Sequence, residues 1–357
     1  LTGIDAGFSP DSQENLYAGT TAGNASDADT CFNIALGYKA GYTNCAGDDN
    51  IILGCCAAYC LQSGGCNIFI GKQAGKSSTT GTFNIAIGEG AASNCNLTGG
   101  NNIALGRNAG YFISGGGCNL FLGLQAGKYA NSNDGIALGR EALAGAVSSG
   151  NDNIAIGCQA AYKMTSGNTN ITIGKSAGRC ITTGYQNIYL GENAGLGYSS
   201  AATGFNNVAI GQGAGYAICC ANNGVFIGTD AGYCNKIGKR NVYVGCGAGK
   251  CMGDAGGADN VAIGHCALAG STTTSSNTGG SNVSIGEGSG FAITSGSQNV
   301  MIGKGAGKSL TSAGCNIFIG NCAGQELATG ASNILMGNYA GRCMCGSANQ
   351  NIAFGQF

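Results

Sequence analysis

One five-residue pattern, Asn-apolar-x-apolar-Gly, recurs through almost the whole chain, and most of its steps are 17 or 18 residues long. It occurs, for example, as Asn67–Gly71, Asn84–Gly88 and Asn153–Gly157. The 21 glycines that close the pattern run from Gly3 to Gly355, so their mean spacing is 17.6 residues (352/20). Self-similarity at a fixed period is the signature of a repeat architecture, and this period is too short for the helical repeats.

We number the repeat from this closing glycine, which is position 0. Position −4 is Asn in 18 of 20 full repeats, −3 is always Ile, Val or Leu, and +3 is Ala with one exception. An apolar-x-apolar tripeptide between Asn and Gly predicts a short strand with a turn at each end. A unit this small cannot bury its own apolar face, so it must stack on copies of itself. The repeat therefore predicts an all-β fold, a parallel β-solenoid (β-roll or β-helix) of about 20 coils of 17–18 residues.

No change of composition marks a linker, so we expect a single continuous β-solenoid array over residues 1–357. The chain begins two residues before Gly3 and stops two residues after Gly355, and neither end carries a polar capping element. Uncapped solenoid ends present unpaired strand edges. We therefore expect either part of a longer array or copies that join head to tail in a filament.

The Asn at position −4 is predicted to stack from coil to coil, with each side-chain amide bonding to the next. The alternative is that this Asn serves only as a turn former. The ladder is predicted for Asn67, Asn84, Asn102, Asn119, Asn153, Asn170 and Asn187.

Residues two apart share one face of a strand, so positions −3 and −1 should form one apolar stripe. We expect this stripe to face the solenoid core, as in Ile68, Ile70, Ile85, Ile87, Ile154 and Ile156. Position −2 then points the other way and is also mostly apolar. The second apolar face is predicted to include Phe69, Phe121, Tyr189, Phe226, Tyr243 and Phe318. It is either an apolar ridge on a monomeric rod or a surface that packs on another chain, for example in a trimer.

Composition and charge exclude several classes of function. Glycine makes up 69 of 357 residues without a Gly-X-Y period, which excludes collagen. A net charge of −1 gives no basic footprint for nucleic acid. No apolar run is long enough for a membrane-spanning helix, so no membrane insertion is expected.

The 20 cysteines lie mostly in turns and outer segments. Cys234 and Cys251 share one phase on successive coils, and Cys45 and Cys60 are nearly in phase, so both pairs are candidate inter-coil disulfides. The alternative is that such cysteines are reduced and serve as small hydrophobic residues. His265-Cys266 lacks the CxxC spacing of a structural zinc site, so we expect no metal and no other cofactor.

The repeat Asn-Ile-Ala-Ile-Gly-x-x-Ala-Gly, whose first five residues occur at Asn84–Gly88, resembles arrays in tail-fibre and structural proteins of bacteriophages, especially cyanophages. Those arrays are also often rich in Cys, as in Gly65-Cys66-Asn67 here. The pattern is similar, too, to the head of trimeric autotransporter adhesins, a left-handed parallel β-roll. The resemblance implies a fibre or adhesin shaft on a virion or outside a cell.

These observations favour a non-enzymatic structural fibre protein. We expect a stiff rod that assembles with copies of itself, side by side or end to end, and attaches to a surface, with a cell-surface glycan or receptor as the candidate second partner. The alternative is an extracellular filament or matrix fibre of a cell. A polysaccharide-degrading enzyme is less favoured, because its carboxylates should cluster on one face and the charges here are scattered.

Overall fold

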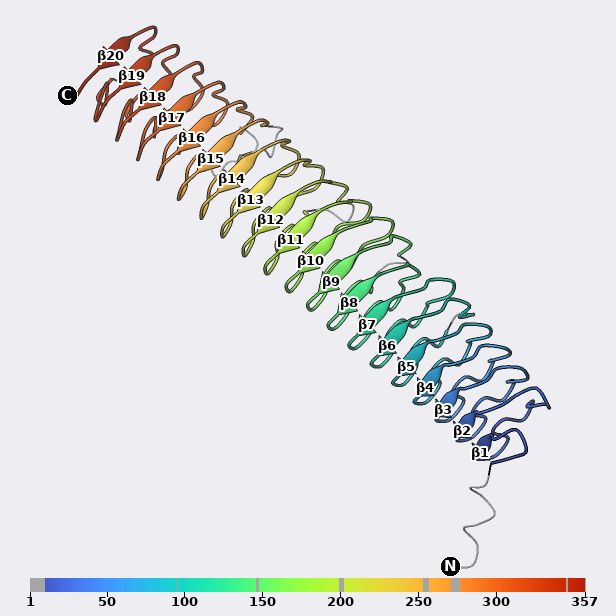
Figure 1. Cartoon of the computed structure of the whole chain (residues 1–357). Helices are drawn as coiled ribbons and strands as arrows, with labels where there is room; N and C mark the ends of the chain where they lie inside the picture. The colour runs from blue at the N-terminus through green and yellow to red at the C-terminus, as the bar shows by residue number, and fades with distance from the viewer. Residues whose placement is uncertain are drawn as a thin grey trace, which may run out of the picture. The chain divides into compact units, whose positions relative to one another are not determined.

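A computed structural model describes residues 10–94, 96–145, 148–198, 202–252, 257–270, 277–344 and 346–356. The chain divides into two compact units, Leu1–Thr169 and Asn170–Phe357. The regular elements of both units are strands of three residues, and no helix occurs in the described ranges. In each unit, short coils are stacked one upon the next, with one strand in every coil (Figure 1).

The strands coincide with positions −3 to −1 of the repeat. In the first unit they are β1 (Leu16–Ala18), β2 (Ile34–Leu36), β3 (Ile51–Leu53), β4 (Ile68–Ile70), β5 (Ile85–Ile87), β6 (Ile103–Leu105), β7 (Leu120–Leu122), β8 (Ile136–Leu138) and β9 (Ile154–Ile156). In the second unit they are β10 (Ile171–Ile173), β11 (Ile188–Leu190), β12 (Val208–Ile210), β13 (Val225–Ile227), β14 (Val242–Val244), β15 (Val261–Ile263), β16 (Val283–Ile285), β17 (Val300–Ile302), β18 (Ile317–Ile319), β19 (Ile334–Met336) and β20 (Ile352–Phe354).

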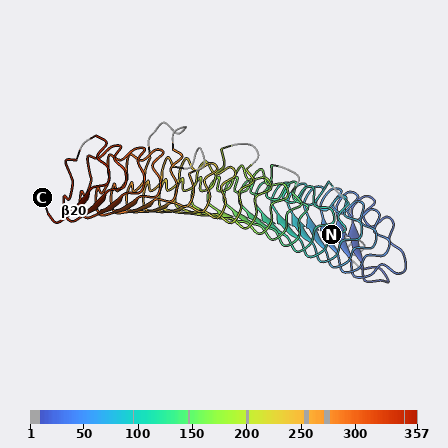
Figure 2. The same ribbon diagram turned by 90° about the horizontal axis from the view of Figure 1, so that it is seen from above.

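Within a unit, each strand pairs in parallel with the next strand, and the same repeat positions lie opposite each other. Between β4 and β5, for example, Phe69 is the partner of Ala86. The register is also kept where a repeat is longer than the usual 17 or 18 residues. Ile188 pairs with Val208, and Val261 pairs with Val283. Viewed from above, the strands of each unit line one side of its stack and the turns line the other (Figure 2). The predicted parallel β-solenoid, one coil per repeat, is confirmed; a single array over 1–357 stays a prediction.

Position −2 of each strand lines the interior. The prediction that positions −3 and −1 face the core is therefore wrong. Phe69 and Phe121 are fully buried, whereas Ile87 on the same sheet is 39% exposed. The predicted core residues Ile68, Ile70, Ile85, Ile87, Ile154 and Ile156 point outward and are partly or largely exposed. The predicted outer residues Phe69, Phe121, Tyr189, Phe226, Tyr243 and Phe318 are buried in the core.

The physical reason lies in the Asn at position −4. Its side chain is buried, and residues two apart in an extended chain share a face, so position −2 must point inward with it. The other inward positions are the Ala at +3 and a residue at +7, such as Ile113 or Ala130. Large and small residues are combined within a coil: Phe121 at −2 occurs with Ala130 at +7, and Ala104 with Ile113. This pairing keeps the enclosed volume filled.

The Asn ladder is confirmed where both partners lie in one unit. Asn67 Nδ2 donates to Asn50 Oδ1 at 3.0 Å and to the Gly81 carbonyl at 2.9 Å, and its backbone N–H also donates to Asn50 Oδ1. The backbone N–H of Asn84 likewise donates to Asn67 Oδ1. Both the backbone N–H and the side-chain amide make this bond from Asn102 to Asn84, from Asn119 to Asn102 and from Asn187 to Asn170. Asn153 is buried and donates to the Gly167 carbonyl at 2.7 Å. Because these amides are buried and bond across coils, the Asn is more than a turn former.

Two repeats have Gly in place of this Asn, and the ladder adapts through the backbone. The N–H of Gly135 donates to Asn119 Oδ1 at 2.9 Å, and that of Gly224 donates to Asn207 Oδ1 at 3.0 Å. The acceptor of the preceding coil is therefore satisfied even where the side chain is missing.

Glycine at position 0 is required by the closeness of successive coils. Gly71 has a φ of +129°, and a Cβ there would lie 2.7 Å from the carbonyl oxygen of Gly88. The glycine at +4 is required by the core instead. Gly232 has a φ of +60°, and its Cβ would lie 2.4 Å from the Phe226 ring. The sequence therefore uses glycine once for coil-to-coil contact and once for packing within the coil.

The first prediction tests the ladder. Asn316 accepts two bonds from Asn333 and donates to Asn299 and to the Gly330 carbonyl, all at 3.0 Å. Asn316→Ala leaves buried polar groups without partners and should lower the free energy of unfolding by about 1–3 kcal/mol or more. The control is Asn321→Ala, which removes an exposed Asn–Asn contact to Asn338 and should change stability by under about 0.5 kcal/mol. Urea unfolding followed by circular dichroism measures both, and equal losses would contradict the ladder.

The second prediction separates backbone strain from packing. Gly288 has a φ of +62°, and a Cβ added there would have no atom within 4 Å. Gly288→Ala should therefore lower the free energy of unfolding by about 1–2 kcal/mol through backbone strain alone. Gly232→Ala has the same backbone strain and in addition meets the Phe226 ring, which adds about 1–3 kcal/mol. Urea midpoints of the two variants measure the difference. Similar midpoints would show that the ring does not limit position +4.

The third prediction concerns Tyr243, which is fully buried and whose Oη has no hydrogen-bond partner in the described ranges. Burial raises the pKa of Tyr243 above its usual range. The neutral phenol therefore favours folding below about pH 10, and this contribution is lost as the pH rises further. Tyr243→Phe should match or exceed the parent stability at pH 7 and should weaken the loss of stability toward about pH 11. Thermal unfolding at both pH values measures this; a clear loss at pH 7 would indicate an important hydroxyl contact.

Candidate functional surface

The outer face of the strands is the most unusual surface of both units. Positions −3 and −1 point outward in every strand, and all 40 of these residues (20 strands × 2) are apolar. Several are markedly exposed, for example Leu122 at 45% and Ile263 at 40%. A sheet face that meets water normally carries polar residues. We call these two columns the outer apolar face; within each unit it runs along the whole stack of strands.

The adjoining turn edge is polar and carries charges that pair between coils. Three ion pairs join residues at position +1 of successive coils: Lys72–Glu89 at 3.7 Å, Lys175–Glu192 at 3.0 Å and Lys304–Glu287 at 2.9 Å. The hydrogen bond from Lys304 lowers the pKa of the Glu287 carboxyl. Because these groups are exposed, the pairs contribute little stability. Their arrangement places a polar rim beside the outer apolar face.

Aromatic side chains stack between coils farther along the turn, at position +5. Tyr42 and Tyr59 lie 4.9 Å apart at an interplanar angle of 6°, and Tyr216 and Tyr233 lie 4.6 Å apart at 9°. The Lys39 ammonium lies 5.3 Å from the Tyr42 ring and 5.6 Å from the Tyr59 ring. This edge therefore presents aromatic rings together with a cation that lies close to them.

Neither of the predicted inter-coil disulfides is formed: the 18 described cysteines include no disulfide bond. The N–H of Cys234 donates to the Lys250 carbonyl at 2.8 Å, which places Cys234 opposite Cys251, as expected. The other pair is out of register. The N–H of Thr43 donates to the Tyr59 carbonyl, so Cys60 lies opposite Thr43 and two residues away from the phase of Cys45. The prediction of a Cys45–Cys60 bridge is therefore wrong.

No group of three or more His, Cys, Asp or Glu side chains in the described ranges could hold a metal ion. His265 Nε2 does lie 3.5 Å from Cys266 Sγ, as their adjacency in the sequence suggests. The expectation that the protein uses no cofactor, and the expectation that it is not an enzyme, stay predictions.

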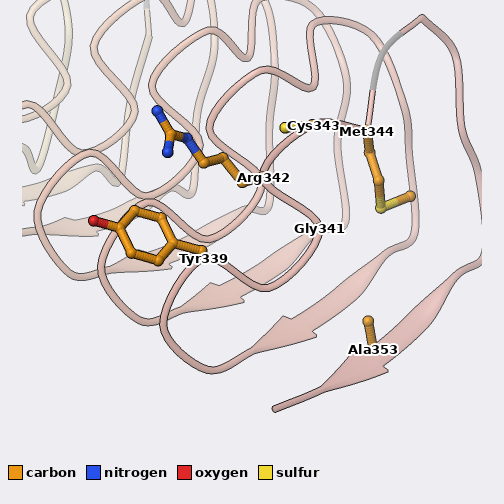
Figure 3. Close-up of a pocket in the computed structure, with 6 residues that line it drawn as sticks. All are labelled: Tyr339, Gly341, Arg342, Cys343, Met344 and Ala353. Carbon is orange, nitrogen blue, oxygen red and sulfur yellow. The ribbon is translucent and has the colours of Figure 1, made fainter. Parts of the chain in front are cut away.

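A cavity of about 700 Å³ lies at the last coil of the second unit (Figure 3). Met344 and Ala353 point into it from a turn and from β20, and they occupy the inward positions +7 and −2. The cavity is therefore the uncovered interior of a coil. Its lining residues are Tyr339, Gly341, Arg342, Cys343, Met344 and Ala353.

A second cavity, of about 490 Å³, lies between two outward-facing columns of the second unit. It is lined by Thr203, Phe205, Cys220, Asn222, Ile237, Lys239 and Ala258. Neither cavity brings together an acid, a base and a nucleophile in the way that an active site does.

No protein-family model matches the chain, and no curated protein matches its sequence. The part of the chain that the structure describes contains no helix with the length and apolar character needed to span a membrane.

Proposed function

We propose that the protein is a non-enzymatic structural fibre protein that assembles with copies of itself through the outer apolar face and mediates attachment to a surface. It would act outside a cell or on a virion, as a tail-fibre or adhesin shaft does. This proposal rests on the resemblance of the repeat to such proteins and on one observation, the unbroken apolar character of the outward strand positions.

A second copy of this chain is the partner that best fits the outer apolar face. The face consists of two aliphatic columns whose members repeat at the spacing of parallel strands, about 4.8 Å. A copy presents columns with the same spacing and the same range of side-chain sizes, so the two faces can interdigitate along their length. The charged residues at position +1 would then form a polar rim around an apolar centre, which is the usual anatomy of a protein interface. Closed association with two or three copies, a trimer included, would cover the face fully.

Stacking end to end is the second mode of assembly that we propose. At β20, Ile352 and Phe354 are 67% and 66% exposed, well above the other strands, and the interior of the coil is uncovered. Another coil of the same kind, from a second copy or from a continuation of the same array, would pair with the edge of β20 and cover this interior. This mode gives a filament, whereas side-by-side packing gives a bundle.

Attachment is assigned to the turn edges, because these carry the polar and aromatic groups. Lys39 with its tyrosine neighbours and the exposed Tyr198, 69% accessible, offer rings and a cation for a cell-surface glycan or receptor. A cellular filament or matrix fibre would use the same assembly without a host receptor. The solenoid alone fits both, and the native source of the assembled particle distinguishes them.

The fourth prediction tests assembly. Ile210→Lys combined with Ile227→Lys places two charges in the −1 column of adjacent coils, where the parent side chains are 36% and 37% exposed. The matched control, Gln212→Lys with Thr229→Lys, adds the same charges on the same coils at the exposed position +1. We expect the parent and the control to sediment as oligomers at micromolar concentration and the outer-face variant to dissociate, because buried unpaired charges are costly.

Circular dichroism and urea unfolding establish that the outer-face variant keeps its fold. A parent protein that sediments only as a monomer, or an outer-face variant that assembles as well as the control, would overturn the proposed assembly. Electron micrographs of the parent distinguish side-by-side bundles from end-to-end filaments.

A further inference from the structure

Two pairs of neighbouring cysteines place their sulfur atoms in contact at the surface. Cys55 Sγ lies 3.5 Å from Cys56 Sγ in the first unit, and Cys219 Sγ lies 3.5 Å from Cys220 Sγ in the second. Cys55 and Cys220 are exposed, and their neighbours are partly exposed. A disulfide has a sulfur–sulfur distance of about 2.05 Å, so each pair is a dithiol. Both dithiols are accessible to small molecules in solution.

Backbone hydrogen bonds to the adjoining coil hold each dithiol in place. Cys56 has a left-handed φ of +56°, and its N–H donates to the Tyr38 carbonyl at 2.8 Å. Cys219 and Cys220 both donate their N–H groups to the Lys236 carbonyl, at 3.0 and 2.9 Å. The two pairs occupy different phases of the repeat, one just after the repeat glycine and the other in the opposite turn segment. The stack thus fixes the backbone of the dithiols before any ligand binds, which lowers the entropic cost of binding.

In the first pair, the surroundings of Cys56 favour the protonated form of its thiol. Burial raises the pKa of the Cys56 thiol, and the hydrogen bond with Cys55 raises it further, while the nearby Lys76 and Lys39 act in the opposite direction. When one metal or metalloid atom that bonds strongly to sulfur binds to a protonated pair, both thiols lose their protons and both sulfurs bond to that atom. We call this atom the bound centre.

The distance between the sulfurs limits the geometry of that centre. A metal–sulfur bond of about 2.3 Å, as for zinc, would need sulfurs about 4.6 Å apart for linear coordination. At 3.5 Å the two sulfurs instead form a bent arrangement around one atom. A tetrahedral zinc site would be bent as well, but it takes at least three protein ligands, and no group of three or more His, Cys, Asp or Glu side chains in the described ranges supplies them. A trivalent pyramidal centre that already carries one substituent needs only the two sulfurs, and soft thiolates favour such thiophilic centres.

We propose that Cys55–Cys56 and Cys219–Cys220 are two chelating sites for a trivalent thiophilic metalloid, of which arsenic(III) is the type. With a monosubstituted arsenous oxide, the two S–H bonds and the arsenic–oxygen bond break, two arsenic–sulfur bonds form, and one water leaves. The oxidation state of arsenic and of sulfur is unchanged, so no oxidant or reductant is needed. This inference is independent of the proposed fibre function, because each site is complete within one unit.

Isolated surface cysteines provide the matched control. Cys66 and Cys118 are exposed, and among the described contacts neither has a second sulfur within hydrogen-bonding distance. A single thiol binds an arsenous oxide through one bond, which an excess of a monothiol displaces. A chelating pair resists displacement, because both bonds must break before the centre leaves.

The fifth prediction is made for the full, reduced chain with phenylarsine oxide as the probe. After gel filtration in excess 2-mercaptoethanol, intact-mass spectrometry should show arsenic retained at both pairs. Cys55→Ser with Cys56→Ser, and Cys219→Ser with Cys220→Ser, should each lose one retained arsenic relative to the parent. Cys66→Ser with Cys118→Ser should retain the parent number, and 2,3-dimercaptopropanol should release all of it.

The comparison with the parent is the criterion, and circular dichroism checks that each variant is folded. A parent chain that retains no arsenic would overturn the proposal. So would a variant that lacks one pair and still retains the parent number, because the retained arsenic would then lie on other thiols. Loss of arsenic from the Cys66 and Cys118 variant would show that simple exposure, rather than the paired sulfurs, determines binding.

Discussion

The close approach of successive coils at the repeat glycines is the constraint on which the structure depends. A Cβ on Gly71 would lie 2.7 Å from the Gly88 carbonyl oxygen, so any side chain there would push the coils apart. At this separation the parallel strands form their hydrogen bonds and the buried Asn side chains reach from coil to coil. The glycine column thus sets the spacing that the ladder and the strand pairing both require.

The Asn ladder in turn decides which side of each strand is inside. An amide that bonds across coils while shielded from water must lie in the core, and position −2 shares its face. The interior is narrow, since Ala at +3 and Gly at +4 border it, so one large residue such as Phe226 nearly fills a coil. Branched aliphatic residues at −3 and −1 are consequently displaced to the outside. The outer apolar face is therefore a product of the way the core is built, and covering it is the driving force of the association that we propose.

Departures from the repeat give individual coils their distinct chemistry. A solenoid aligns equivalent positions in columns, so a residue type that recurs in one phase becomes a stack, as with Tyr42 and Tyr59. The vicinal cysteines are a different case, because their two sulfurs meet within one coil, between neighbouring positions of the repeat, and not along one column. Their adjacency was visible in the sequence, but the sequence did not show that the backbone turns both thiols to the same side.

The sequence by itself determined the parallel solenoid, the strand in each coil, the register and the Asn ladder, because all of these follow from the phase and spacing of a repeated motif. Only the tertiary structure decided which face of each strand points into the core. Alternation in a strand defines two faces without saying which is inner, and here both are apolar, so Ile85 and Phe69 could not be assigned from pattern alone. It also decided that Cys60 lies opposite Thr43 and not Cys45, since a shift of two residues within a turn depends on the backbone bonds made there.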